Sequence, residues 1–98
     1  MKRKELSKER YLEIKYYCRQ YKEKKKLSYQ DTAQGRRARA DVKLMEYIAG
    51  EVDPVLSEYI LKQVSTGIPY EQLIGCPCGR RQFYDARNEF LNRLSKIK

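Results

Sequence analysis

The sequence predicts an all-α protein of about five helices, with a long N-terminal amphipathic helix and a C-terminal helix-turn-helix. Apolar residues recur at three- and four-residue spacing through most of the chain, no segment shows the two-residue alternation of a strand, and prolines and glycines mark the ends of the periodic segments. At 98 residues the chain has room for one small domain. We therefore expect residues 1–98 to form a single helical unit.

The first predicted element is a basic amphipathic helix within residues 1–25. Its stretch ELSKERYLEIKYYCRQYKEKK (5–25) contains no proline or glycine. One apolar stripe runs through Tyr11, Ile14, Cys18 and Tyr21, and lysines, arginines and glutamates fill the opposite side. The tyrosines are expected to pack in and around the core rather than to stack on bases.

Residues 26–37, KLSYQDTAQGRR, lose the helical periodicity and contain turn-forming residues and a glycine. They are predicted to form a loop. Arginines cluster at its end and just beyond, and lysines and an arginine lie at the N-terminus. The residues expected to contact phosphate are Lys2, Arg3, Lys4, Arg36, Arg37 and Arg39.

Residues 38–98 are predicted to form a helical core. Its first helix covers residues 38–50 and has an apolar stripe that includes Val42 and Met45. For the next helix Asp53 is a suitable N-cap, Pro54 suits the first helical position because its missing N–H is not needed there, and Gly67 is a natural stop.

A helix-turn-helix is predicted at residues 68–96. A short helix of about two turns is expected to begin at Pro69, to point Leu73 and Ile74 inward and to end at Gly75. The second helix starts near Arg80. Its apolar stripe consists of Phe83, Ala86, Phe90, Leu91 and Leu94. The Cys-Pro-Cys-Gly segment makes the turn about two residues longer than the standard motif.

The charge distribution indicates a polyanionic partner. The net charge is +9, with eleven Lys/Arg against four Asp/Glu in residues 1–26 and six against three in residues 70–98, whereas the middle of the chain is slightly acidic. Nucleic acid is the polyanion that fits best, and double-stranded DNA is the expected partner. The chain has no membrane-length apolar run and no signal-peptide pattern, so we expect an intracellular protein without a membrane partner.

The cysteines do not match a metal or redox site. The chain has three cysteines and no histidine, and Cys76 and Cys78 are separated by a single proline, which fits neither a zinc site nor a C-x-x-C motif. It has no phosphate-binding glycine loop and no base for a nucleophilic thiol. No cofactor, no metal and no enzymatic activity are expected. Cys76 is expected to pack as a small apolar residue, with Cys78 or Gly79 capping the last helix.

The last helix carries the predicted DNA contacts on the side away from its apolar stripe. Arginine can donate two hydrogen bonds to guanine, and asparagine can pair with adenine in the major groove. The predicted DNA-binding residues are Arg80, Arg81, Gln82, Tyr84, Arg87 and Asn88. An ordinary bundle helix with solvated arginines is the alternative interpretation of the same pattern.

Three patterns carry a resemblance to a known family: D-P-x-x-x-x-Y-I-L-K, G-x-P-Y-E and G-x-P-C-x-R-x-x-F-Y, together with YLEIKYYCRQYKEKKK near the N-terminus. With them the chain resembles small prophage-encoded transcription regulators of Gram-positive bacteria, of the ArpU or RinA kind, whose C-terminal part resembles sigma-factor region 4. The resemblance does not extend to the middle loop. It implies that Arg80, Arg81, Tyr84 and Arg87 lie on a DNA-facing helix anchored by Phe83, in a protein of the bacterial cytoplasm.

The sequence is also compatible with two other functions. The tyrosine-rich helical faces also suit a phage adaptor that binds a host protein such as RNA polymerase, because tyrosine combines a large contact area with a polar tip. RNA could replace DNA as the nucleic acid. The long first helix could supply the interface of a homodimer, which a palindromic DNA site would require.

Overall fold

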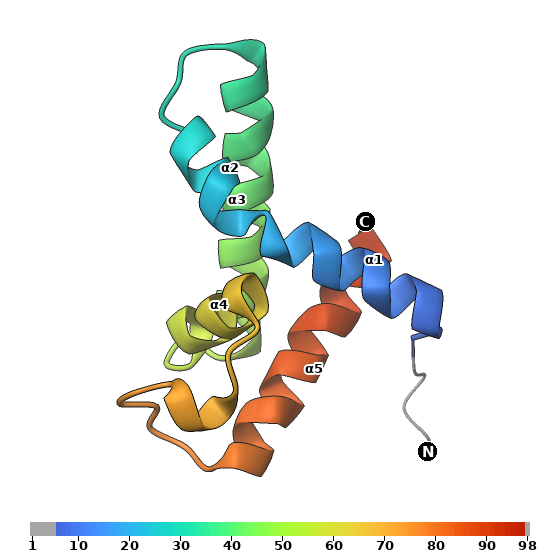
Figure 1. The fold of residues 1–98 in the computed structure, drawn as a ribbon, viewed down its shortest axis with the longest axis vertical. Helices are drawn as coiled ribbons and strands as arrows, with labels where there is room; N and C mark the ends of the chain where they lie inside the picture. The colour runs from blue at the N-terminus through green and yellow to red at the C-terminus, as the bar shows by residue number, and fades with distance from the viewer. Residues whose placement is uncertain (1–5, 98) are drawn as a thin grey trace.

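The chain folds into five α-helices and one turn of 3-10 helix (Figure 1). The computed structural model describes residues 6–97, and this part of the chain contains no strand, which confirms the predicted all-α class. The elements are α1 (Lys8–Arg19), α2 (Tyr21–Leu27), α3 (Ala33–Val52), α4 (Ser57–Thr66), η1 (Tyr70–Gln72) and α5 (Arg80–Ile97).

The N-terminal helix is divided, where one continuous helix was predicted. The Ser7 side chain caps α1 by accepting a hydrogen bond from the Arg10 amide, and the helix ends at Arg19. At Gln20 the amide bonds to the Tyr17 carbonyl, three residues back, and α2 leaves in a new direction (Figure 1). The bend lets α1 pack on α4 and α5 while α2 packs on α3.

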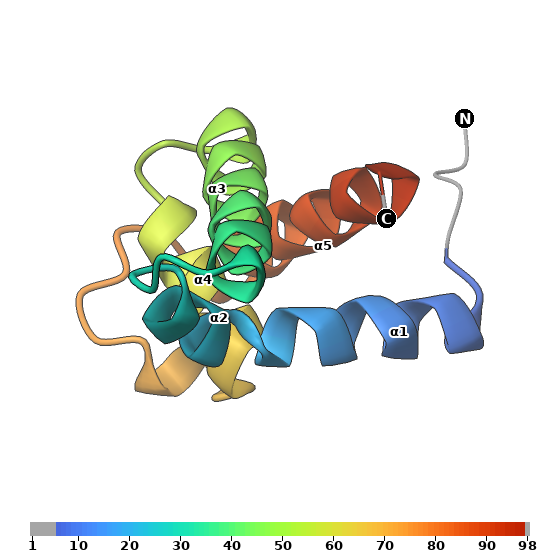
Figure 2. The ribbon, with the colours of Figure 1, turned by 90° about the horizontal axis from the view of Figure 1, so that it is seen from above.

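Two tyrosines attach this bent segment to α3. The Tyr17 hydroxyl donates to an Asp41 carboxylate oxygen at 2.9 Å, and the Tyr21 hydroxyl donates to Glu46 at 2.7 Å. Lys24 forms an ion pair with Asp41 at 3.1 Å. These two tyrosines therefore serve packing and anchoring, and α2 lies along α3 as the second arm of a hairpin (Figures 1 and 2).

The loop predicted at residues 26–37 is shorter, with only residues 28–32 between α2 and α3. The Thr32 side chain caps α3 by accepting from the Gly35 amide at 2.9 Å. Gly35 lies directly under the preceding turn, where a Cβ atom would come within 2.2 Å of the Gln30 carbonyl oxygen. The glycine therefore marks a close approach inside a helix and not a break in it.

The entry to α4 differs from the predicted geometry by three residues. The Asp53 carboxylate accepts hydrogen bonds from the amides of Val55 and Leu56, so it does cap free N–H groups as expected. Residues 54–56 form a turn, however, and regular helix begins at Ser57. At the other end Gly67 adopts a left-handed conformation, φ 76°, and stops the helix as predicted.

The first helix of the predicted helix-turn-helix is reduced to η1, a single turn of 3-10 helix. Leu73 is buried as expected, but Ile74 is 90% exposed, so the prediction that both point inward was wrong. With one apolar anchor in place of two, the segment cannot bury the face that a two-turn helix needs. Residues 73–79 then connect η1 to α5.

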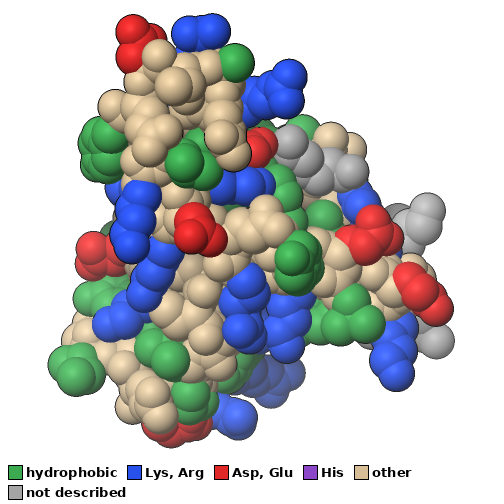
Figure 3. All heavy atoms as spheres, turned by 45° about the horizontal axis from the view of Figure 1, so that its top comes forward, with side chains coloured by type: hydrophobic (Ala, Val, Ile, Leu, Met, Phe, Trp, Pro, Cys, Tyr) green, Lys and Arg blue, Asp and Glu red, His purple; other side chains and the backbone are tan. Residues whose placement is uncertain are grey.

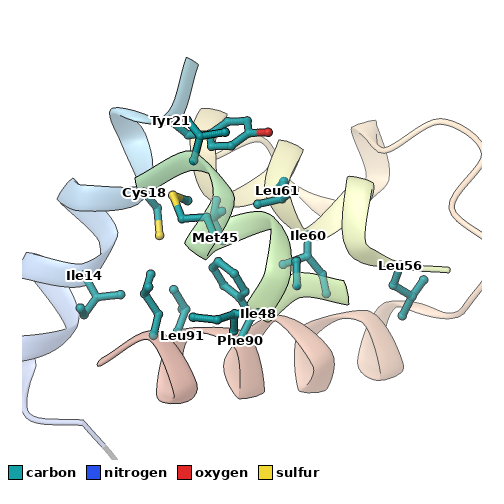
Figure 4. Packing of buried hydrophobic residues seen from close by; sticks show 14 of the residues in the cluster. Ile14, Cys18, Tyr21, Met45, Ile48, Leu56, Ile60, Leu61, Phe90 and Leu91 are labelled. Atoms are coloured by element: carbon teal, nitrogen blue, oxygen red, sulfur yellow. The ribbon is translucent and has the colours of Figure 1, made fainter. Parts of the chain in front are cut away.

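The core lies where α1, α3, α4 and α5 meet. Met45, Ile60, Phe83, Phe90 and Leu94 have no exposed surface. Figure 4 shows their neighbours from all four helices converging on Phe90, so the apolar stripes predicted from the sequence are the faces that pack. The buried Phe83 ring anchors the first turn of α5 and thereby fixes which side of that turn faces solvent.

Candidate nucleic-acid interface

The start of α5 is held by its connection to η1. The Tyr59 hydroxyl donates to the Gly75 carbonyl at 3.0 Å, and the Tyr70 hydroxyl donates to the Cys78 carbonyl. The Gly79 carbonyl accepts from the Phe83 amide at 3.0 Å, which places Gly79 at the N-cap. The long turn is thus tied to the body of the protein and presents the first residues of α5 in a defined orientation.

Arg81 and Gln82 are the most accessible of the predicted DNA-binding residues. Both are exposed; Arg81 lies on the side of α5 opposite Phe83, and Gln82 lies about 100° round the helix from Phe83. Within residues 6–97 neither side chain has a hydrogen bond or an ion pair that would have to be given up on binding. Their amide and guanidinium donors are free to meet base edges.

Arg80 is exposed but engaged. Its guanidinium forms an ion pair with Glu71 at 3.1 Å and lies 5.4 Å from the centre of the Tyr84 ring. An exposed ion pair contributes about 0–1 kcal/mol. A phosphate group could therefore displace Glu71 from Arg80 at little cost.

Tyr84 is half-buried and takes part in packing. Its hydroxyl accepts a hydrogen bond from the Tyr70 amide at 3.1 Å, and its ring meets Phe83 edge-on with centroids 5.5 Å apart. The ring is flanked by the guanidinium groups of Arg80 and Arg87. These contacts tie Tyr84 to η1 and leave little of it for a base.

Arg87 and Asn88 are also half-buried and bind each other. An Arg87 Nη2 donor lies 2.8 Å from the Asn88 Oδ1 acceptor. The Arg87 guanidinium lies 4.8 Å from the centre of the Tyr84 ring, and its Nε is buried without an acceptor among the described residues. The structure thus turns Arg87 towards the junction of α5 with α1 and α4, and away from Arg81.

At that junction Arg87 meets two cations of α1 that are not among the residues predicted individually to bind DNA or phosphate. Lys15 and Arg19 line a small cavity together with Arg87 and with Gly67 at the end of α4. Figure 3 shows Lys and Arg side chains gathered near the middle of one face, below α1. Lys15 and Arg19 are four residues apart, and this helical spacing beside Tyr11 and Cys18 was the signal that could have identified them.

The predicted phosphate contacts of the middle segment lie on the first turns of α3 and not in a loop. Arg36 forms an ion pair with Asp31 at 3.8 Å, Arg37 is exposed, and Arg39 donates twice to the Ser28 carbonyl, at 3.2 and 2.9 Å. Arg39 thereby closes the turn before α3. Lys2, Arg3 and Lys4 lie outside the described residues.

These groups are not gathered on one small patch. The start of α3 and the start of α5 lie at opposite ends of the long axis of the molecule, which extends over 43 Å (Figure 1). The basic groups near the middle lie between them. A ligand that touched all three regions would have to be a long polyanion.

The Cys-Pro-Cys segment holds two free, half-buried thiols whose sulfur atoms are 4.0 Å apart. Burial raises the pKa of the Cys78 thiol, and its hydrogen bond with Cys76 adds to the effect. Within residues 6–97 no three Cys, Asp or Glu side chains come together as a metal site would require. The segment serves to support the turn before α5.

Comparison with protein-family models, with curated proteins and with solved structures found no match to this chain. Among residues 6–97, no helix combines the length and apolar character needed to cross a membrane.

Proposed function

We propose that the chain is a sequence-specific duplex DNA-binding protein that acts as a phage or prophage transcription regulator. The observation that carries the proposal is the first turn of α5, where Arg80, Arg81 and Gln82 are exposed above a buried Phe83. The N-terminal turns of a helix in the major groove are where base contacts are made. The net charge of +9 supplies the attraction to the backbone.

The roles within this surface follow from accessibility. Arg81 and Gln82 contact base edges, and Arg80 exchanges Glu71 for a phosphate. Tyr84 holds the helix in place through its contacts with Tyr70 and Phe83. The helix-turn-helix geometry is not part of the proposal, because η1 is a single turn; α5 is positioned by the tied connection instead.

The test begins with selection of bound sequences from random duplex DNA, followed by a salt titration on the selected site. If about six phosphates are neutralised, log affinity should fall against log salt with a slope of about −5. A slope near zero, or no binding at low salt, would remove the DNA-binding proposal. Tighter binding to an RNA duplex than to DNA in direct competition would replace DNA by RNA.

Arg81→Ala tests the reading role, and Arg93→Ala is its matched control. Both arginines are exposed on α5, but Arg93 lies near the other end of the helix in an ion pair with Glu89. Loss of a base contact costs about 1–3 kcal/mol at one position of the site and relaxes the preference there. Equal weakening on all sequences would assign Arg81 to a phosphate. If both variants bind DNA as tightly as the wild type, the DNA-binding surface does not lie on α5.

The exposed tyrosines give the adaptor alternative a structural basis. Tyr16 and Tyr47 are 70% and 66% exposed, on α1 and α3. Co-purification with host RNA polymerase that survives nuclease treatment, and is lost on Tyr16→Ala or Tyr47→Ala but kept on Arg81→Ala, would favour the adaptor over the DNA-binding function.

A further inference from the structure

A small cationic cavity lies where the end of α4 meets α1 and α5. Its volume is about 50 Å³, and Lys15, Arg19 and Arg87 border it together with Gly67 and Gln63. It lies apart from Arg81 and Gln82, which point to the exposed side of α5. The base-reading surface does not account for it.

The cations of this cavity are uncompensated. Six ion pairs are formed within residues 6–97, and none of them includes Lys15, Arg19 or Arg87. The residues that line the cavity include no Asp or Glu. Three like charges brought together repel one another unless an anion lies between them.

One donor at this junction is left without an acceptor. The Arg87 Nε is buried, and it is the one buried side-chain nitrogen or oxygen in the described part of the chain that lacks a hydrogen-bond partner. A buried donor that lacks an acceptor destabilises a fold, and native proteins rarely leave one. An anion at the cavity is an acceptor that would satisfy it.

The Arg87 guanidinium is held in place before any ligand arrives, and the Arg19 guanidinium lies against the end of α4. Arg87 is fixed by stacking on the Tyr84 ring, 4.8 Å away, and by its 2.8 Å hydrogen bond to Asn88. Arg19 lies so close to Gly67 that a Cβ there would come within 2.0 Å of the Arg19 Nη2. The negative end of the α4 dipole also attracts a cation at this point. This attraction explains the position of Arg19 but not the presence of Lys15 and Arg87 in the same cavity.

The size and the donors identify the ligand class. A cavity of about 50 Å³ compares with roughly 10–15 Å³ for one water measured in the same way. It therefore holds a few oxygen atoms, as a phosphoryl group requires. Arginine side chains bind phosphate with paired, charge-assisted hydrogen bonds.

We propose that the cavity bordered by Lys15, Arg19 and Arg87 is a binding site for a phosphoryl group. That group is either a phosphate of a nucleic-acid backbone or a free phosphate, and the chemistry of recognition is the same for both. The proposal does not depend on α5 reading DNA.

The first experiment titrates inorganic phosphate against chloride at equal ionic strength and follows the arginine Nε–Hε signals by NMR. The Arg19 and Arg87 signals should shift and saturate with phosphate, whereas the signal of Arg93, which is paired with Glu89, should not. Small, linear shifts of the same size at all three arginines would overturn the proposal.

Substitution provides the second measurement. Arg87→Gln should weaken phosphate binding roughly tenfold or more. Lys15→Gln changes an exposed side chain that the fold does not need, and it should weaken binding up to about fivefold. Phosphate should raise the melting temperature of the wild type and of Arg93→Gln more than that of either variant. An equal rise in all four proteins would contradict the site.

Duplex DNA then separates the two sources of the phosphoryl group. If a backbone phosphate occupies the cavity, Arg19→Gln should reduce the salt slope of DNA binding by about 1, and DNA should displace inorganic phosphate from Arg87. If the slope is unchanged while phosphate binding is lost, the cavity holds a free phosphoryl ligand. DNA binding without any phosphate effect at the cavity would reject this site and leave the proposed function standing. Phosphate binding at the cavity without any DNA binding would support this site and reject the proposed function.

Discussion

The hydroxyl of Tyr84 accepts a hydrogen bond from the backbone amide of Tyr70 at a distance of 3.1 Å. This bond joins the second turn of α5 to η1, fourteen residues earlier in the chain. It gives the Tyr84 hydroxyl a structural task at the position where the sequence suggested contact with DNA.

Removal of that hydroxyl should therefore affect stability more than recognition. Tyr84→Phe leaves the Tyr70 amide without its acceptor and should lower the free energy of unfolding by about 1 kcal/mol. Denaturant unfolding measures the loss, with Tyr16→Phe, an exposed tyrosine of α1, as the unaffected control. A change in DNA sequence preference without a loss of stability would restore a reading role to Tyr84.

Two glycines of α3 should respond in opposite ways to alanine. A Cβ at Gly35 would lie 2.2 Å from the backbone oxygen of Gln30, whereas a Cβ at Gly50 would have nothing within 4 Å. Gly35→Ala should lower the unfolding free energy by about 1–3 kcal/mol, because backbone has to move. Gly50→Ala should raise it by roughly 0.5–1 kcal/mol, because alanine restricts the unfolded chain. Thermal melts measure both changes. If both variants melt at a higher temperature than the wild type, the packing of residues 28–32 on α3 is disproved.

The contact between α2 and α3 should make stability depend on pH in the acid range. The hydrogen bond from the Tyr21 hydroxyl lowers the pKa of the Glu46 carboxyl, and Lys25 contributes in the same direction. A lowered folded-state pKa stabilises the fold fully above the unfolded value of about 4.3 and loses this contribution as pH falls through the folded value.

Glu46→Gln should accordingly flatten the fall in unfolding free energy between about pH 5 and pH 3. Denaturant unfolding at a series of pH values measures the slope. Glu23→Gln, an exposed residue of α2 without an ion pair in residues 6–97, should keep the wild-type slope. If the two variants behave alike, the Tyr21–Glu46 bond does not carry the acid dependence.

The three thiols should differ in reactivity. Cys18 has no exposed surface, and burial raises the pKa of its thiol to about 12. Cys76 and Cys78 are half-buried and free. A disulfide reagent at neutral pH should reach Cys76 and Cys78 in the folded protein and Cys18 only after denaturation. Because the thiolate is the reactive form, the raised pKa of Cys78 should make this thiol react more slowly than Cys76. Rapid modification of all three in the folded state would contradict the packing of α1.

The helices were largely predictable because their apolar stripes are local patterns. The stripe of Ile14 and Cys18, that of Met45 and Ile48, and that of Phe83 and Phe90 each follow helical spacing, and each packs as expected. The boundaries were less predictable. Gly35 suggested a loop, but it lies inside α3, where the close approach of the Gln30 carbonyl leaves no room for a Cβ atom. No local pattern reveals this approach.

The site was predictable in part. Arg81 and Gln82 are exposed as expected, since neither belongs to the apolar stripe of the helix. Tyr84 and Arg87 were assigned to the same exposed side, but contacts with Tyr70 and with the junction of three helices draw them inward. The basic side of the first helix was predictable, but no local pattern places Lys15 and Arg19 beside Arg87.

The sequence by itself determined the all-α class, the faces of the helices that pack and the basic character that points to a polyanion, because periodicity and charge are local properties of the chain. The tertiary structure decided the bend at Gln20, the collapse of the expected short helix into η1, and the meeting of Lys15 and Arg19 with Arg87. The meeting of Lys15 and Arg19 with Arg87 joins helices from opposite ends of the chain, and the bend and η1 depend on contacts with other helices. Such contacts arise only when the hydrophobic stripes pack together.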